Sequence, residues 1–152
     1  APDKPTYAEA PDGCLDSGLL FGGAFPWESS MLALSDMAKA ESWTMSPSLT
    51  EIQSAIRELG DPSRAVISIY FRNPYVLDDE SGVKQAGALF ATFGVSDRAQ
   101  MDVIAGKSAP AGRLPFALPA TRRSILEQHP DSPGYADTKD GPLYPFGYGL
   151  SY

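Results

Sequence analysis

The stretch SLTEIQSAIRELGDPSRAVISIYF, residues 48–71, decides the fold class. Ser48 and Glu51 form a capping box at the start of a predicted helix, which continues with apolar residues at helical spacing. Gly60 and the following Asp-Pro pair end that helix. The run 65–71 comes next and is apolar and β-branched, which is typical of a strand buried on both faces in a parallel sheet. A helix followed by a buried strand is therefore predicted here.

A second unit of the same kind follows. Residues 86–93 are apolar and predict another buried strand, and Ser96 can cap a helix over 97–105 that ends at Gly106. Residues 114–119 are extended, because their two prolines exclude helix for the residue before each. This alternation predicts an α/β fold, a layered sandwich with a mostly parallel sheet.

The rest of the chain is organised around this core. We expect one domain over 1–152, with an irregular, insertion-like segment at 1–47, the helix and strand core at 48–119, and a C-terminal loop and aromatic tail at 120–152. Within the first segment, residues 28–41 carry a broad apolar stripe and predict a helix. Residues 120–142 are polar and are expected to be loop.

The closing residues 144–152, YPFGYGLSY, combine four aromatic rings with two glycines and no charge. So much apolar area is costly to leave in water, so we expect the rings to hold the tail against the domain. The chain opens with Ala-Pro-Asp, which suggests a processed product or a piece of a longer polypeptide.

Composition narrows the class of protein. The chain has 152 residues and a net charge of −7, which argues against nucleic acid or an anionic membrane as a partner. No apolar run approaches the roughly 20 residues that span a bilayer. The single cysteine, Cys14, excludes an internal disulfide and is compatible with the cytoplasm or with secretion.

Four segments, in order, resemble parts of the second, α/β sandwich domain of glycoside hydrolase family 3. They are Ser68–Leu77 with its Arg-x-Pro turn, Phe93–Ala99, Pro110–Pro119, and Leu143–Tyr152 preceded by Asp137–Lys139. Gly94-Val95 departs from the family, in which a Pro-Gly pair is commoner. The resemblance covers roughly two thirds of the chain. It implies an incomplete domain of a larger two-domain enzyme.

The resemblance also implies a function. Members of this family are typically exo-acting β-glucosidases or β-xylosidases that retain stereochemistry and use no cofactor. Retaining cleavage needs two carboxyl groups about 5–5.5 Å apart. In the family the nucleophile is an Asp of an N-terminal (β/α) barrel domain, which these residues lack, so the chain alone is expected to be inactive on its β-linked glycoside substrate.

Two residues are candidates for the site. Pro5-Thr6-Tyr7-Ala8-Glu9 resembles the family stretch that holds the acid/base, with one residue inserted, which makes Glu9 the acid/base candidate. The alternative is a solvated loop glutamate. Arg72, directly after the first buried strand, is a candidate for substrate binding, since ligands of such sheets bind beyond the carboxyl ends of strands. A structural ion pair is the alternative for Arg72.

Other polar residues are assigned simpler roles. Asp36 stands in a Ser-Asp-Met stretch but is interpreted as an exposed helix position rather than a nucleophile. The triplet at 78–80 lacks the alternating spacing of a calcium loop and is interpreted as a solvated turn. His129 has no partner at metal-ligand spacing, so no metal site is predicted. Trp27 and Trp43 are expected in the core, with sugar stacking as the alternative.

A rival interpretation of the whole chain is a non-catalytic sugar-binding or protein-interaction module with the same fold. A nucleotide-binding domain is disfavoured, because no glycine-rich phosphate loop follows a strand. The edge of an incomplete sheet is unpaired and invites a second copy to bind there, so a homo-oligomer is a further expectation.

Overall fold

A computed structural model of the chain describes residues 32–129, 132 and 134–151. The helices and strands, in chain order, are α1 (Leu34–Met37), α2 (Leu49–Glu58), β1 (Val66–Tyr70), β2 (Ala88–Thr92), α3 (Asp97–Ile104), β3 (Leu118–Pro119), α4 (Arg122–Glu127) and β4 (Pro142–Tyr144). Two 3₁₀ turns, Pro62–Arg64 and Val83–Gln85, precede β1 and β2. This small α/β arrangement is consistent with the predicted fold class.

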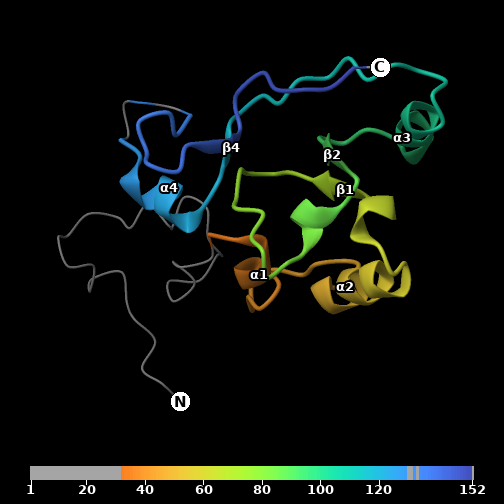
Figure 1. The fold of residues 1–152 in the computed structure, drawn as a ribbon, viewed down its shortest axis with the longest axis horizontal. Coiled ribbons are helices and arrows are strands. Elements are labelled where there is room, and N and C mark those ends of the chain that lie inside the picture. Colours follow the sequence, from red (N-terminus) through yellow and green to blue (C-terminus); the bar gives the residue numbers. More distant parts are fainter. Residues whose placement is uncertain (1–31, 130–131, 133, 152) are drawn as a thin grey trace.

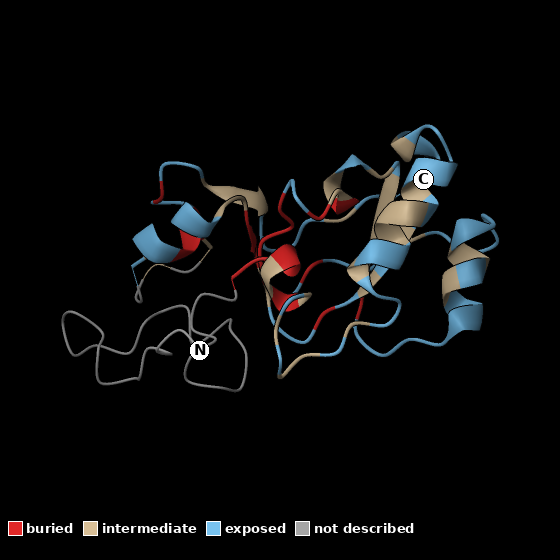
Figure 2. Ribbon diagram, turned by 90° about the horizontal axis from the view of Figure 1, so that it is seen from below, coloured by how far each residue is buried: buried red, intermediate tan, exposed pale blue. Residues whose placement is uncertain are grey.

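Helix α2 forms as its sequence predicts. The Ser48 hydroxyl accepts a hydrogen bond from the backbone N–H of Glu51, and the Glu51 carboxylate accepts one from the backbone N–H of Ser48 at 2.8 Å. These two bonds satisfy amides that a helix start otherwise leaves unpaired. No residue of α2 is fully buried, so the helix lies on the outside of the domain (Figure 2).

Strands β1 and β2 pair in parallel, with Val66 opposite Ala88 and Tyr70 opposite Thr92. One face of the pair, which includes Ile67 and Leu89, packs against the larger of the two clusters of buried apolar side chains that form the core. On the other face Val66 and Tyr70 are 50% and 61% exposed. The prediction of a strand buried on both faces is therefore wrong for β1, since Val66 and Tyr70 remain exposed on its outer face.

Partial cover on that outer face comes from α3. The Ser68 hydroxyl donates a hydrogen bond of 2.6 Å to the side-chain oxygen of Gln100. Helix α3 begins at the predicted Ser96 cap, whose hydroxyl accepts from the backbone N–H of Ala99. The second predicted strand and helix are thus both present.

Helix α1 is much shorter than the predicted helix at 28–41. The backbone of Leu32 and Leu34 is bonded to that of Val76, with both N···O distances 2.9 Å. This parallel bridge holds residues 32 and 33 extended, so the described helix starts only at Leu34. A contact distant in sequence here overrides the local helical pattern.

The C-terminal third contains more regular structure than predicted. Helix α4 lies within residues 120–142, which were expected to be loop, and its start is capped by Thr121. Strands β3 and β4 pair antiparallel. Beyond β4 the tail lies beside residues 112–114, where Leu114 donates to the carbonyl of Tyr148 and accepts from Gly147 (Figure 1).

The tail is therefore docked, but mainly through its backbone. Tyr144 and Tyr148 stack with ring centroids 4.8 Å apart. Tyr144 packs against the larger core cluster, as expected of the rings, whereas Phe146 is 73% exposed and does not hold the tail by burial. Gly149 lies so close to Gly112 that a Cβ atom would stand 2.5 Å from the Gly112 carbonyl oxygen.

Two clusters of buried apolar side chains form the core. The larger one joins α1, the residues that follow β1 and the start of β3, and it includes Leu34, Phe71, Leu77 and Leu118. The smaller one joins the Ala33–Val76 bridge to α4 through Ile125 and to Tyr135. Buried residues gather around α1 and the segments beside it, whereas α2 and α3 are largely exposed or intermediate (Figure 2).

Candidate functional site

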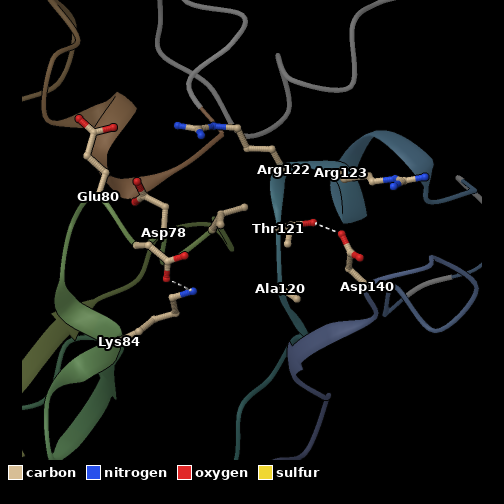
Figure 3. A pocket seen from close by; sticks show the side chains of 10 residues that line it. Asp78, Glu80, Lys84, Ala120, Thr121, Arg122, Arg123 and Asp140 are labelled. Carbon is tan, nitrogen blue, oxygen red and sulfur yellow. Dashed lines mark hydrogen bonds and ion pairs between the residues drawn. The ribbon is translucent and has the colours of Figure 1, made fainter.

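A pocket of about 400 Å³ opens between the segment that follows β1 and the start of α4 (Figure 3). Its first wall consists of Val76, Asp78, Asp79, Glu80 and Lys84, and its second consists of Ala120, Thr121, Arg122, Arg123 and Asp140. The first wall belongs to the segment between β1 and β2. Several polar side chains converge on this hollow, which makes the pocket the candidate site.

Asp78 anchors the first wall. It is only 8% exposed. Its carboxylate accepts a hydrogen bond of 2.5 Å from the Ser35 hydroxyl and one of 3.2 Å from the Ser35 backbone N–H. The Ser81 hydroxyl donates to the Asp78 carbonyl, which tightens the turn that follows. A buried carboxylate needs such donors, so the solvated-turn interpretation is wrong for Asp78.

The remaining charges of this wall are paired. Lys84 lies 2.7 Å from Asp79, and Lys39 of the α1 end lies 2.6 Å from Glu80. The Glu80 carboxylate, through this hydrogen bond, raises the pKa of Lys39. The wall is rich in charge, but Lys84 within it and Lys39 beside it balance the two carboxylates that they face.

Thr121 and Asp140 are bonded to each other in the second wall. The Thr121 hydroxyl accepts from the Ser124 backbone N–H and so caps α4, and it donates a hydrogen bond of 2.7 Å to Asp140 Oδ2. In the close view these two side chains point toward each other across the edge of the pocket, whereas Arg123 points away from the space between the walls (Figure 3). Arg123 instead pairs with Glu127.

Arg122 connects the second wall to α1. It reaches past the pocket to α1, where its Nε and Nη2 donate to the two oxygens of Asp36 at 3.0 and 2.6 Å. Asp36 also accepts from the backbone N–H of Ala33, 3.1 Å away. The prediction that Asp36 is an exposed helix position is therefore wrong. Asp36 forms a two-pronged ion pair that joins α1 to α4.

Of the two predicted site residues, the structure describes only Arg72. Glu9, the acid/base candidate, falls outside the described residues, as do Cys14 and Trp27. Arg72 is exposed, does not line the pocket, and forms no ion pair with any described residue. His129 is exposed, and Trp43 packs against the larger core cluster. Of the described candidates, neither Arg72 nor His129 nor Trp43 lines the pocket.

Thr121, Arg122 and Asp140 are not among the predicted site residues, because the polar segment 120–142 predicts a loop. One signal was present: a threonine just before a short stretch with Ile125 and Leu126 is a usual helix start. In the described part of the chain, no three His, Cys, Asp or Glu side chains come together as a metal site. Among the described helices, none is long and apolar enough to cross a membrane.

Comparison with known proteins identifies similar sequences. The model of the glycosyl hydrolase family 3 C-terminal domain matches residues 23–152. A probable beta-glucosidase C of Aspergillus flavus is 39% identical over 87 residues, which are 57% of this chain and 13% of the relative. A periplasmic beta-glucosidase/beta-xylosidase of Dickeya chrysanthemi is 36% identical over 87 residues, or 57% of this chain and 12% of that protein.

A putative beta-xylosidase of Formosa agariphila is 33% identical over 110 residues, 67% of this chain and 14% of the relative. The chain thus spans only 12 to 14% of the length of these three proteins.

Proposed function

Because the chain belongs to glycosyl hydrolase family 3, within its C-terminal domain, we propose that it works as part of a retaining, exo-acting β-glycosidase. The enzyme would hydrolyse terminal β-linked sugars, and this chain would form part of the substrate site. The family match over residues 23–152 carries the proposal. The relatives named beta-glucosidase and beta-xylosidase support the choice of bond and sugar class.

The chemistry requires a second domain. Retaining hydrolysis uses one carboxylate as nucleophile and one carboxylic acid to protonate the leaving oxygen. We assign the nucleophile to an N-terminal (β/α) barrel domain that would pack on this chain, and the acid/base role to Glu9. The acid/base must be protonated when the bond breaks, which requires surroundings that disfavour its charge.

Arg72 is proposed as a substrate contact. It follows β1 directly, its side chain is exposed, and within the described residues it forms no ion pair, so its guanidinium is available to sugar hydroxyls. A guanidinium offers several donors in a fixed plane, which suits hydroxyl oxygens held in one orientation.

The two-domain proposal predicts a difference between this chain and the polypeptide that includes the barrel. The 152-residue chain should not hydrolyse an aryl β-glucoside, whereas the longer polypeptide should. Turnover by the chain alone at the rate of an intact glycosidase would refute the division of the carboxylate pair. Sugar binding by the longer polypeptide without any turnover would favour the non-catalytic module instead.

The role of Glu9 has its own test in the longer polypeptide. Glu9→Gln removes the proton donor, so hydrolysis of a glycoside with a poor leaving group should fall by about 10²–10⁴-fold, while one with a good leaving group should lose much less. Glu58→Gln, a matched change at an exposed position of α2, should leave both rates unchanged. Equal losses on both substrates with Glu9→Gln would contradict an acid/base role.

A further inference from the structure

Strand β1 has one edge that faces no other strand. Ala65 and Phe71, at its two ends, form backbone hydrogen bonds of 3.0 Å with the residue before β2 and with the last residue of β2. Backbone groups of successive strand residues point in opposite directions, so those of Val66, Ser68 and Tyr70 point away from β2. In the part of the chain that the structure describes, β1 pairs with β2 alone, and these groups therefore lie at an open edge.

The same three residues carry the exposed side chains of the strand. Val66 is 50% and Tyr70 is 61% exposed, and Ser68 between them is exposed as well. Helix α3 reaches this face through the hydrogen bond between Ser68 and Gln100, but it leaves Val66 and Tyr70 open to water. Free backbone groups and exposed apolar side chains thus occur together, which makes this edge a surface that another strand would cover favourably.

Nothing in the sequence of this edge protects it from a further strand. The run 65–71, AVISIYF, contains no charged residue, no proline and no glycine. The register of β1 against β2 is continuous from Val66 to Tyr70, without a bulge. Edge strands that stay unpaired commonly carry a lysine, a proline or a bulge, or are covered by a helix or loop.

The edge is complementary to itself. When two copies of β1 lie antiparallel across a twofold axis at Ser68, Val66 of one copy faces Tyr70 of the other, twice over. A β-branched residue opposite an aromatic one is a favourable cross-strand pair. The residues that face each other are also those whose backbone groups point outward, so each pair can exchange two backbone hydrogen bonds. One register therefore satisfies the backbone and the side chains together.

We propose that two copies of the 152-residue chain associate through their β1 edges, antiparallel about Ser68. An aromatic side chain offers about 150–250 Å², of which Tyr70 leaves 61% exposed. Two such rings and two half-exposed valines supply only a few hundred Å², well below the roughly 1,600 Å² of a standard interface. The area thus specifies a weak dimer, in which the backbone bonds set the register.

Charge gives the association a distinct salt dependence. Each copy has a net charge of −7, and the antiparallel register brings Arg72, which follows β1, toward Arg64 of the second copy. Both terms are repulsive and are screened by salt. Raising the salt concentration from about 0.05 to 0.5 M should therefore strengthen the dimer. A dimer that weakens with salt would instead be held by ion pairs, which this uncharged edge does not provide.

Hydrogen exchange of single amides tests the register directly. Sedimentation equilibrium from about 10 µM to 1 mM should show monomer and dimer in exchange. The amides of Ser68 and Tyr70 should become protected only as the dimer forms, whereas those of Ile67 and Ile69, which face β2, should be protected at every concentration. A chain that stays monomeric throughout would overturn the proposal. Protection of Ser68 and Tyr70 in the monomer would also overturn it, because another segment of the same chain would then cover the edge.

Three variants test the facing pair. Tyr70→Lys places a charge opposite Val66 at both ends of the interface and should raise the dissociation constant about tenfold or more. Adding Val66→Glu to Tyr70→Lys sets opposite charges against each other across the axis and should recover most of that loss. The control is Leu126→Lys, at a 60% exposed position of α4, which lies well apart from β1 (Figure 1); it should change the constant by less than about twofold.

All three positions are exposed, so the variants should keep the parent's circular dichroism spectrum and urea midpoint. If Tyr70→Lys weakens the dimer no more than Leu126→Lys does, β1 is not the interface. If the double variant associates less well than Tyr70→Lys alone, Val66 does not face Tyr70 and the antiparallel register is wrong.

Discussion

The ion pair between Asp36 and Arg122 should couple α1 to α4 energetically, and a double-mutant cycle measures that coupling. Two hydrogen bonds of 3.0 and 2.6 Å join the side chains, which are 21% and 47% exposed. Exposed pairs contribute about 0.2–1 kcal/mol. The two-pronged geometry and the partial burial of Asp36 place this pair at the upper end, so we expect a coupling free energy of about 1 kcal/mol.

The single substitutions Asp36→Asn and Arg122→Gln should each lower the free energy of unfolding by about 1.5 kcal/mol, and the double variant by about 2 kcal/mol. Urea unfolding followed by tryptophan fluorescence reports these values, since Trp43 packs against the larger core cluster. The coupling should decrease at high salt, because about half of the Arg122 side chain is exposed to mobile ions.

The pair of Arg123 and Glu127 provides the matched control. It lies within one helix at i, i+4 spacing, with the side chains 55% and 35% exposed, and should show a coupling of only about 0.3–0.5 kcal/mol. If the singles at Asp36 and Arg122 add up to the double within about 0.3 kcal/mol, the two-pronged contact does not couple the helices and the reasoning fails.

Three single substitutions test other features of the structure. Gly87→Ala should lower the free energy of unfolding, measured in urea, by about 3 kcal/mol or more, since the new Cβ would stand 1.8 Å from the Ser63 carbonyl oxygen. The Cβ of the control Gly112→Ala would meet nothing within 4 Å, so this change should cost little. Equal costs for the two substitutions would contradict the steric argument. Ser48→Ala should cost about 1 kcal/mol and reduce helicity in circular dichroism through loss of the α2 cap, and no change would mean that the cap is dispensable. Burial raises the pKa of Tyr135 from 10.0 to about 12, so its contribution to stability is complete below pH 10 and is lost as pH rises toward 12. Tyr135→Phe should therefore flatten the alkaline fall of the melting temperature, and an unaltered pH profile would refute that role.

The sequence predicted those helix starts and strands that are determined by residues close to one another in the chain. The capping box at Ser48 and Glu51 and the Ser96 cap place the starts of α2 and α3 correctly. The parallel pair also follows from its two apolar runs. These signals succeed because the bonds that define a helix start join residues only three apart.

The candidate pocket could not be predicted in this way. Its key contacts join Ser35 to Asp78 and Asp36 to Arg122, which are 43 and 86 residues apart. A contact between residues distant in sequence also shortens α1, because the backbone of Val76 is bonded to the residues just before this helix. Patterns within a window of 11–18 residues contain no information on such partners.

The 86-residue separation between Asp36 and Arg122 also has a consequence for the timing of folding. At about 5–20 residues per second, synthesis reaches Arg122 roughly 4–17 seconds after Asp36. During that interval the capped helix α2 and the first strand are complete, but the carboxylate of Asp36 lacks its guanidinium. Closing so long a loop also carries an entropic cost before any contact compensates for it. The α1 end should therefore gain its bond to α4 later than α2 gains its cap as the chain emerges from the ribosome.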